Sequence, residues 1–338
     1  MKVGLLGLGF MGSTHLQGLA GIAGAEVAAV MDTNERRLAG DMSDIQGNLG
    51  ISGQAMDFSK VRKYRTAAEI LADPDVEAVD ICLPTHLHAP VAIEALRAGK
   101  HVLVEKPMAL DGEAAREIIA EAERAGRILM TAQVCRFLAP YEFLFALVKG
   151  SRLGQVRSAF FRRRTAVPTW GPWEFDKSKS GGGVFDLLIH DVDQALHLFG
   201  APAAISATGY ENMAGGIDSI VAEFHYEDTG NVTIAGGWHH RGEYPFSMEY
   251  TVIGDNGVVE FSSAGRPAAV YWKDGSRETS TAGGGVDPYR AEIEYFLECC
   301  RSGRQPERCL PADSAASVRL TKLMVAARDK RGEKVQCS

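Results

Sequence analysis

Short apolar runs alternate with longer amphipathic segments along residues 1–131. The apolar runs are rich in Val, Ile and Leu, which is typical of buried strands, whereas the segments between them have helical periodicity. We expect strands at residues 3–6, 27–31, 80–83, 102–105 and 128–131. Because strands that alternate with helices form a parallel sheet with helices on both faces, this pattern predicts a doubly wound α/β domain.

The pattern changes from residue 155 onward. Alternating or apolar runs, separated by turns rich in Gly, Asn and Asp, predict strands at 155–164, 204–209, 217–226, 231–236, 247–253, 258–262 and 268–272. One amphipathic helix is expected among them, at residues 184–199. The second region is therefore predicted to be an α+β domain built on an open, mostly antiparallel sheet.

These patterns give three expected segments. Residues 1–131 would form a dinucleotide-binding domain, residues 132–310 a domain for substrate binding and oligomerisation, and residues 311–330 a C-terminal helix. Residues 41–59 are polar, rich in Gly and Ser, and poorly periodic, which indicates an irregular insertion at the edge of the first sheet.

Several helix boundaries are marked by capping residues. Thr66 and Glu69 have the spacing of a capping box, in which each side chain bonds the other residue's backbone amide. Residues 111–125 have the pattern of an amphipathic helix, and Gly126 follows at the position where a left-handed residue usually ends a helix. These signals support one helix that begins near Thr66 and another that follows the expected strand at 102–105.

Composition limits the classes of partner. A length of 338 residues, with 46% hydrophobic and 23% charged residues, is enough for two cores of a globular enzyme. The net charge of -7 argues against nucleic acid or an anionic membrane as a partner. No apolar run approaches the ~18 residues that span a bilayer, and the first residues lack a signal-peptide pattern. Six cysteines without C-x-x-C spacing favour reduced thiols, so we expect a cytoplasmic protein.

A glycine motif follows the first expected strand. The sequence from Gly7 to Gly12 matches G-x-G-x-x-G, with Phe10 and Met11 at the two variable positions before the last glycine. Gly7 would permit the tight turn, Gly9 would let the backbone approach a pyrophosphate, and Gly12 would let the helix pack closely on the strand. The motif alone is a weak signal, but its place between a strand and a helix predicts a Rossmann site for a dinucleotide.

An acidic residue ends the second expected strand. Asp32 lies 20 residues after the last glycine, at the position where a carboxylate accepts hydrogen bonds from the adenosine ribose. A carboxylate there repels a 2′-phosphate, which favours NAD over NADP. Arg36 and Arg37 lie on the following helix and keep NADP open as the cofactor.

Glu105, Lys106 and Pro107 follow the apolar run at 102–104. Ligands of open α/β sheets bind at the carboxyl ends of the strands, so Lys106 is expected to point at a site. A surface lysine that closes a strand would be the better interpretation if the glycine motif did not precede it. The Lys106–Pro107 bond is a candidate for a cis peptide, because cis bonds are largely confined to X-Pro.

Pro84, Thr85 and His88 follow the strand expected at 80–83, and we predict that all three contribute to cofactor binding. His88 has a second interpretation as a histidine satisfied at the start of the next helix, which we weigh at least equally.

The helix expected at 184–199 carries Asp186, His190, Asp193 and His197. Spacings of four, three and four place these side chains on one helical face. The stripe has three interpretations: a polar surface, a metal site, or a catalytic group. A metal is disfavoured because no further acid-rich helix or C-x-x-C motif supplies the rest of a ligand shell, so we predict none.

Aromatic and imidazole side chains in the second half are candidates for sugar contacts. Sugar rings expose apolar C–H faces, for which indole rings are suitable platforms. The candidates are Trp170, Trp173, Trp238, His240 and Tyr244. Each has the alternative of loop or interface packing.

Four motifs together resemble the Gfo/Idh/MocA family, and the resemblance runs from Lys2 to the last helix. They are the glycine motif, the sequence PTHLH at 84–88, the sequence EKP at 105–107, and the sequence GGGVFDLLIH at 181–190. The resemblance implies an NAD(P)-dependent dehydrogenase that acts on CH–OH groups of a sugar, inositol or related polyhydroxy compound.

The resemblance also implies roles for individual residues. His190 would take the hydroxyl proton, Asp186 would orient its ring, and Lys106 would bond the same hydroxyl, with the identity of the formal base left open. Trp170, Trp238 and His240 would contact substrate. Gln133 lies in a stretch that flanks the nicotinamide in relatives, and the helices near 287–300 and 311–330 would pack back on the first domain.

Two alternatives remain from the sequence. The chain could oxidise a nucleotide-linked sugar, or it could be a non-catalytic NAD(H)-binding sensor, although a sensor does not need acid and base groups such as Lys106, Asp186 and His190. The outer face of the second sheet would expose apolar side chains, a pattern typical of oligomer interfaces, so we expect a homodimer or homotetramer.

Overall fold

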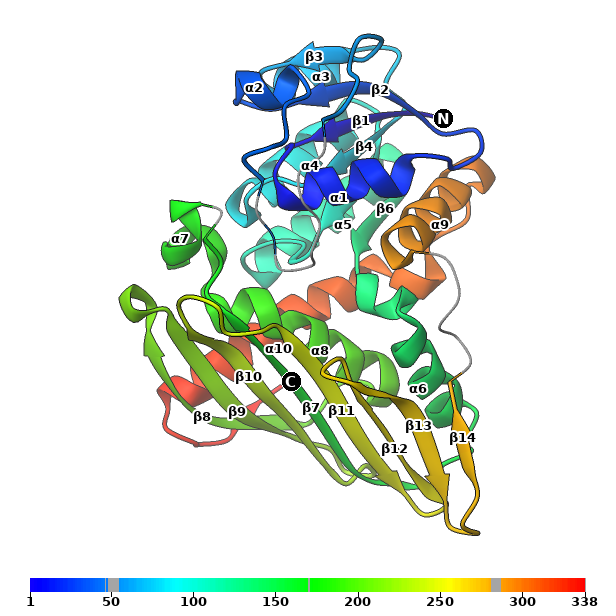
Figure 1. Ribbon diagram of the computed structural model, residues 1–338, viewed down its shortest axis with the longest axis vertical. Coiled ribbons are helices and arrows are strands. Elements are labelled where there is room, and N and C mark those ends of the chain that lie inside the picture. Colours follow the sequence, from blue (N-terminus) through cyan, green and yellow to red (C-terminus); the bar gives the residue numbers. More distant parts are fainter. Residues whose placement is uncertain (46, 48–54, 170, 281–286, 338) are drawn as a thin grey trace. The chain divides into compact units, whose positions relative to one another are not determined.

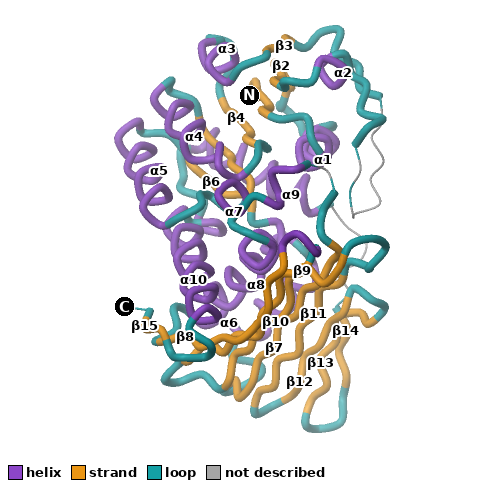
Figure 2. The backbone as a smooth tube through the Cα atoms, turned by 90° about the vertical axis from the view of Figure 1, so that its left-hand side faces the viewer, coloured by secondary structure: helices purple, strands orange, loops and turns teal. Residues whose placement is uncertain are grey.

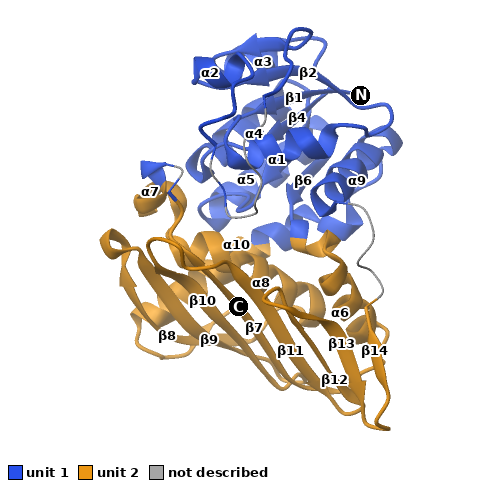
Figure 3. Cartoon of the chain, in the orientation of Figure 1, with its two compact units in different colours: residues 1–134, 169–173, 286–315 blue, residues 135–168, 174–285, 316–338 orange. Residues whose placement is uncertain are grey.

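The computed structural model describes residues 1–45, 47, 55–169, 171–280 and 287–337, so Trp170 lies outside the described residues. The chain forms two compact units (Figure 3). Unit 1 comprises residues 1–134, 169–173 and 286–315, and unit 2 comprises residues 135–168, 174–285 and 316–338. Each unit is built around its own sheet.

Unit 1 contains a six-stranded sheet in the order β3-β2-β1-β4-β5-β6, with all neighbouring strands parallel. The strands are β1 (Lys2–Leu6), β2 (Glu26–Met31), β3 (Arg62–Tyr64), β4 (Ala78–Ile81), β5 (His101–Glu105) and β6 (Leu129–Ala132). This confirms the predicted doubly wound sheet. The edge strand β3 was not predicted, because its sequence Arg-Lys-Tyr contains no apolar run.

Helices cover both faces of this sheet. They are α1 (Phe10–Leu19), α2 (Glu35–Leu38), α3 (Ala67–Ala72), α4 (His88–Arg97), α5 (Gly112–Ala125) and α9 (Pro288–Ser302). Helices α4 and α5 pack together, as do α1 and α9, and the two pairs lie on opposite sides of the strands (Figure 2). The capping box of Thr66 and Glu69 forms as predicted, and Gly126 ends α5 in the left-handed conformation.

Unit 2 contains a nine-stranded sheet in the order β14-β13-β12-β11-β7-β10-β9-β8-β15. The strands are β7 (Val156–Ala166), β8 (Ala204–Asn212), β9 (Ile217–His225), β10 (Asn231–His240), β11 (Ser247–Gly254), β12 (Gly257–Ser262), β13 (Arg266–Trp272), β14 (Arg277–Thr279) and β15 (Val335–Gln336). Only β7 and β10 are parallel among the described pairs, which confirms the predicted mostly antiparallel sheet.

One face of this sheet carries helices. Helix α8 (Gly183–Phe199) lies along β7, β9 and β10, and α6 (Ala139–Lys149) packs against α8 and β13 (Figure 1). Helix α7 (Lys177–Ser180) precedes α8, and residues 316–329 of α10 (Pro311–Asp329) also belong to this unit. In β7, buried and partly exposed residues alternate, so successive side chains point toward the helices and away from them.

The two units differ from the expected segments at the C-terminal end. Helix α9, expected in the second domain, belongs to unit 1, because Ile293, Phe296 and Leu297 are buried where α9 packs on α1, β5 and β6. Residues 311–315 of α10 belong to unit 1, and residues 316–329 belong to unit 2. Two contacts explain this: β15 pairs with β8, and Arg328 forms an ion pair with Asp218 of β9.

The composition led to expectations about disulfides and about membrane-spanning helices, and the fold bears on both. All six cysteines lie in the described part of the chain and are free thiols. None of the helices in the described ranges combines the length and the apolar composition that a membrane crossing requires.

Candidate active site

The glycine turn joins β1 to α1 and has the geometry of a dinucleotide cradle. Gly7 has a φ of +95°, and a Cβ atom there would lie 2.5 Å from the carbonyl oxygen of Cys82. A Cβ atom on Gly12 would lie 1.8 Å from the carbonyl oxygen of Gly7, so only glycine lets the helix approach this closely. Next to Gly9, by contrast, the nearest atom is a guanidinium nitrogen of Arg37 at 3.9 Å.

The amino end of α1 is available to an anion. Gly9 is its N-cap residue and offers no side chain to the first backbone amides of the helix. Open space at Gly9 and uncapped amides next to it are the features that hold a pyrophosphate at a helix N-terminus. The turn therefore fits the phosphate groups of a dinucleotide, with Phe10 and Met11 in the first turn of the helix.

Asp32 lies directly after β2, where its carboxylate is oriented by the backbone. Its two oxygens accept hydrogen bonds from the amides of Leu8 and Asn34, each at 2.7 Å. A carboxylate has about four acceptor positions, so these bonds leave capacity for ribose hydroxyls. The fixed orientation is suited to recognition of a nucleoside.

The two nearby arginines already have acidic partners. Arg36 pairs with Asp41 at 2.7 Å, and Arg37 pairs with Asp44 at 2.9 Å. Binding of a 2′-phosphate by either arginine would compete with these carboxylates.

His88 connects the loops that follow β4 and β5. Its Nδ1 lies 2.7 Å from the carbonyl oxygen of Pro107, and its Nε2 lies 2.7 Å from that of Leu83. Burial lowers the pKa of His88, and the two carbonyl contacts oppose this shift. The ring thus holds the backbone around Pro84 and Thr85 in place. This agrees with the alternative that the sequence left open, a histidine whose hydrogen bonds are satisfied at the start of a helix.

Lys106 lies immediately after β5, at the same carboxyl edge of the sheet as the glycine turn. It is partly buried, and its peptide bond to Pro107 is cis, as predicted. The backbone amide of Lys106 donates a hydrogen bond of 2.9 Å to Oε2 of Glu105. Glu105 is itself only 5% exposed, so the position of Lys106 is tied to a buried carboxylate.

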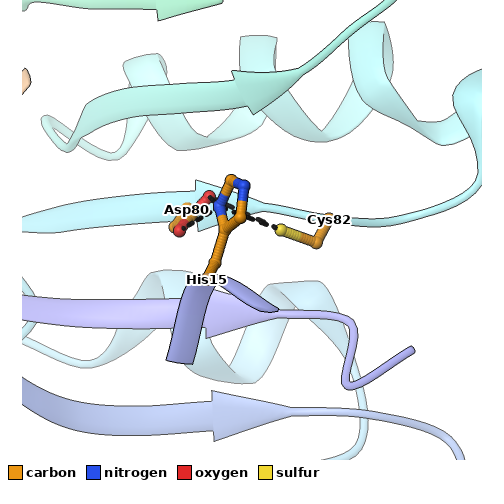
Figure 4. A group of neighbouring side chains, drawn as sticks. All are labelled: His15, Asp80 and Cys82. Carbon is orange, nitrogen blue, oxygen red and sulfur yellow. Dashed lines mark hydrogen bonds and ion pairs between the residues drawn. The ribbon is translucent and has the colours of Figure 1, made fainter. Parts of the chain in front are cut away.

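A buried group of titratable side chains lies behind this strand end. Figure 4 shows three of its members, His15 of α1, Asp80 of β4 and Cys82. Nδ1 of His15 lies 2.9 Å from Asp80 and 3.5 Å from the sulfur of Cys82, and Nε2 lies 3.1 Å from Oε1 of Glu105. The ligand atoms of His15, Asp80 and Cys82 lie within 4.8 Å of one another, a spacing that a metal could bridge. In the structure, Asp80 instead bonds Nδ1 of His15 and the thiol of Cys82.

The sequence analysis missed His15 and Asp80. The available signal was a charged residue inside the apolar run Val79-Asp80-Ile81, because a buried carboxylate requires a partner. The partner comes from a helix 65 residues earlier in the chain, and sequence spacing does not reveal that contact.

Gln133 follows β6 and is 1% exposed. Its Oε1 is buried without a hydrogen-bond partner among the described residues. A buried amide oxygen of this kind costs free energy unless a ligand or water satisfies it. Gln133 therefore fits the predicted cofactor contact at this edge of the sheet.

In unit 2, α8 carries the predicted acid and base groups. His190 is 9% exposed, and Asp186, one turn earlier, is partly exposed. The helix begins after Gly181 and Gly182, both with positive φ, and Gly183 packs against the ring of Trp238, where a Cβ atom would lie 2.4 Å from it. The glycine run thus lets α8 lie close to the sheet at the end that carries Asp186 and His190.

The other two members of the predicted stripe have structural roles. Asp193 forms a two-bond ion pair with Arg136, at 2.8 and 2.9 Å, and both side chains are almost fully buried. His197 stacks on Phe145 with a centroid distance of 4.3 Å. The four residues therefore do not form one polar face, and only Asp186 and His190 remain as candidates for chemistry.

A second buried ion pair on α8 was not predicted. Asp191 binds Arg163 of β7 at 2.8 Å, and Tyr141 lies 3.2 Å from the same guanidinium. Arg163 belongs to a run of three arginines at 162–164, but its side chain points inward and is 3% exposed.

The candidate sugar-binding side chains differ in their exposure in the structure. Trp238 is 1% exposed and packs on Gly183 and, edge to face, on Phe175 at 6.4 Å. This corrects its prediction as a platform, because no ring face is accessible to a sugar. His240 is exposed, and its Nδ1 accepts a hydrogen bond of 2.8 Å from the amide of Arg241. Trp170 lies outside the described residues.

Family models match both halves of the chain. Residues 1–133 match the model described as "Oxidoreductase family, NAD-binding Rossmann fold", and residues 141–260 match the GFO/IDH/MocA C-terminal domain. Unit 1 is therefore an NAD-binding Rossmann domain, and the chain is an oxidoreductase.

Individual relatives match over most of the chain. It is 26% identical over 320 residues to myo-inositol 2-dehydrogenase of Thermotoga maritima, with 90% of each chain covered. It is 30% identical over 318 residues to 4-carboxy-2-hydroxymuconate-6-semialdehyde dehydrogenase of a Sphingobium species, with 90% of this chain and 92% of that protein covered. A solved structure of levoglucosan dehydrogenase with NADH and L-sorbose has a TM-score of 0.85 at 20% identity, covering 100% of this chain and 99% of the other.

Proposed function

Since the chain belongs to the GFO/IDH/MocA family of NAD-binding oxidoreductases, we propose that it oxidises a carbinol carbon of a sugar, inositol or related polyhydroxy compound. The observation that carries this proposal is Lys106, a partly buried amine at the carboxyl edge of a sheet whose glycine turn fits a dinucleotide. The names of the inositol and levoglucosan dehydrogenases support a polyhydroxy substrate.

When bound, NAD supplies the hydride acceptor for this reaction. The residues that would hold it are Gly7, Gly9 and Gly12 at the pyrophosphate, Asp32 at the ribose, and Gln133 toward the nicotinamide. Pro84 and Thr85 would line the same edge, and His88 would hold their loop in place.

Lys106 and His190 would share the chemistry of the substrate hydroxyl. The ammonium group of Lys106 would donate a hydrogen bond to this hydroxyl and stabilise the oxygen as its proton leaves. His190 would accept the proton, and Asp186 would orient the imidazole and stabilise its charged form. Imidazole suits this role because its unperturbed pKa of ~6.5 lies near neutrality.

We propose NAD rather than NADP as the preferred cofactor. Asp32 presents a negative charge where a 2′-phosphate would lie, and Arg36 and Arg37 are each paired with an aspartate. A 2′-phosphate would have to displace these carboxylates and approach a third.

A panel assay tests the proposal. Purified protein is mixed with NAD and each of a set of inositols, aldoses, anhydrosugars and nucleotide-linked sugars, and NADH absorbance is followed. Turnover with a free polyol or sugar supports the proposal, and turnover with nucleotide-linked sugars alone would replace it with the larger substrate class. NAD binding without turnover of any compound would instead indicate a sensor.

Two variants test the residue roles. Lys106→Met and His190→Ala should each bind NAD normally and lose about 100-fold to 10,000-fold in kcat, the usual contribution of a positioned acid or base. His225→Gln, at a histidine of β9 whose ring bonds Ser206, is the matched control and should keep full activity. Normal turnover by either active-site variant would contradict its assigned role.

A further inference from the structure

Four buried side chains of unit 1 form a connected group that the proposed reaction does not use directly. They come from four elements: His15 from α1, Asp80 from β4, Glu105 from β5 and Glu292 from α9. Their exposed fractions are between 0 and 5%. The group lies at the carboxyl half of the sheet and reaches Lys106 through Glu105.

Contacts with two carboxylates determine the charge of His15. Nδ1 lies 2.9 Å from a carboxylate oxygen of Asp80, and Nε2 lies 3.1 Å from Oε1 of Glu105. The contact of Nε2 with Glu105 is an ion-pair distance without hydrogen-bond geometry, but an unprotonated nitrogen at either position would direct its lone pair toward a carboxylate oxygen, so the two contacts favour a proton on both ring nitrogens. His15 is therefore an imidazolium that lies between the carboxylates of Asp80 and Glu105.

The pKa shifts agree with this assignment. Burial lowers the pKa of His15, but Asp80 and then Cys82 raise it, and the net pKa lies well above the usual value. Burial raises the pKa of Glu105, and its hydrogen bond with His15 reverses this, so that the net pKa is lowered.

Glu292 completes the group as a neutral acid. Its Oε1 lies 3.9 Å from Nε2 of His15, and neither of its carboxyl oxygens has a hydrogen-bond partner among the described residues. Burial raises its pKa well above the usual value, and the nearby carboxylates of Glu105 and Asp80 raise it further. With a proton on Glu292, the imidazolium of His15 faces two buried negative charges, those of Asp80 and Glu105. Without that proton it would face three.

The connection to the active site runs through one carboxylate. Oε1 of Glu105 faces His15, while Oε2 accepts the hydrogen bond of 2.9 Å from the backbone amide of Lys106. If Glu105 turned, this amide would lose its acceptor and the residue that carries the amine would shift.

We propose that His15 is a positioning residue for Lys106, acting through the two oxygens of Glu105. The inference rests on the proposed function, because it concerns the amine assigned to the substrate hydroxyl. It has a consequence for the cofactor as well. The amino end of α1 forms part of the pyrophosphate cradle, and His15 lies in the same helix, so one rigid element sets the positions of both the dinucleotide and the catalytic amine.

The charge of His15 is tested without any assay of activity. In protein labelled with 15N-histidine and assigned by comparison with His15→Gln, the His15 signals should show both ring nitrogens protonated from pH 6 to pH 9. The groups facing the ring are Asp80, Cys82, Glu105 and Glu292, with Tyr289 at a centroid distance of 6.1 Å. A neutral tautomer at pH 7 would overturn the inference whatever the enzyme's substrate is.

The positioning role is tested by kinetics on the full chain. His15→Gln should lower kcat about tenfold or more, while the Kd of NAD, measured by fluorescence, and the KM of the polyol change less than about threefold. The double variant His15→Gln/Glu105→Gln should recover part of kcat, because a neutral amide at 105 no longer needs a cation beside it. His101→Gln is the matched control, at the opposite end of β5, where the ring accepts the amide of Ile128.

The possible results distinguish a failure of the positioning role from a failure of the proposed function. If the unmodified protein oxidises a polyol and His15→Gln has the same kcat, the positioning role is wrong. Equal losses of NAD affinity and kcat, without recovery in the double variant, would also overturn it, because they indicate a general loss of structure. If His15→Gln fails to fold, Glu105→Gln is measured instead, with the same loss of kcat expected and unchanged kcat contradicting the proposal.

Discussion

Glu292 illustrates how a single buried residue makes stability depend on pH. Its pKa is raised by burial, so the folded state keeps a proton that the unfolded chain releases above about pH 4.3. The stability that this proton contributes is full below that pH and is lost as pH rises toward the folded-state pKa, by at most ~1.4 kcal/mol per pH unit.

Glu292→Gln removes this dependence, because an amide has the shape of the protonated acid and cannot ionise. The variant should therefore gain stability relative to the unmodified protein as pH rises from 5 to 8, and the two should converge near pH 4. Urea unfolding followed at several pH values measures the difference. A constant difference across this range would show that Glu292 is not protonated in the folded state.

Asp32 makes a prediction about cofactor choice. Asp32→Asn keeps an oxygen that can accept the amide of Leu8 but removes the negative charge that faces a 2′-phosphate. The ratio of kcat/KM for NADP to that for NAD should rise about tenfold or more, since a charged contact contributes ~1.5–3 kcal/mol. The ratio is measured with both cofactors at one polyol concentration, and an unchanged ratio would remove Asp32 from the account of specificity.

At the residue scale, the sequence predicted the location of those groups that belong to a local motif. Gly7, Gly12 and Lys106 have the predicted positions because strand, turn and helix are consecutive in the chain. His15, Asp80 and Glu292 could not be predicted, because their environment is created by elements distant in sequence. Asp193 was included in the stripe on α8 because helical spacing does not reveal that Arg136 pairs with it.

At the scale of elements, α8 is held in unit 2 by buried ion pairs. Asp193 and Arg136 are 1% and 0% exposed, so removal of either charge leaves the other without compensation. Asp193→Asn should lower the free energy of unfolding by about 3–5 kcal/mol. Denaturant unfolding measures this, with Arg157→Ala as the control: its pair with Asp255 is exposed to solvent, so the substitution should have a much smaller effect. Equal effects of the two substitutions would contradict this interpretation of α8.

Element boundaries were predictable where capping residues fix them. Thr66 and Gly126 cap their helices in the structure as predicted, whereas Asp111, expected as the first helical residue, is the N-cap residue of α5. The strand β3 and the helix α6 were missed. The three residues of β3 have no apolar pattern. Helix α6 has a start signal, Pro140 in its first turn, but its apolar residues directly follow the stretch around Gln133 that was assigned to the cofactor site.

At the scale of the molecule, the sheet of unit 2 leaves apolar side chains exposed. Tyr210, Val221, Ile253 and Tyr271 are 41–59% exposed, and ladder pairing aligns Ile253 with Val258 and Val258 with Tyr271 across three strands. Exposed apolar surface of this kind is typical of interfaces between subunits. We predict a homodimer or homotetramer in light scattering at micromolar concentration.

Val221→Lys provides the matching test of this surface, because a charge there would disfavour burial against a second copy. The variant should shift toward the monomer while keeping its unfolding transition. A monomeric unmodified protein, or an oligomer that Val221→Lys does not weaken, would contradict the prediction.

The order of strands and helices along the chain predicted the architecture of both sheets, since short connections leave few arrangements for alternating elements. The expected domain boundaries placed α9 in the second domain, whereas the family resemblance implied that it packs on the first, as its contacts with α1, β5 and β6 now show. An amphipathic helix shows that it buries one face, but its sequence does not identify the surface that covers that face.

Hydride transfer from a substrate carbon is the central claim, and isotope transfer tests it most directly. A polyol accepted in the panel assay is prepared with deuterium at the oxidised carbon and incubated with the protein and NAD. Mass spectrometry of the recovered cofactor should find one deuterium in the nicotinamide ring, and Lys106→Met should transfer almost none while it still binds NAD. Oxidation of the polyol without deuterium in the cofactor would contradict the account.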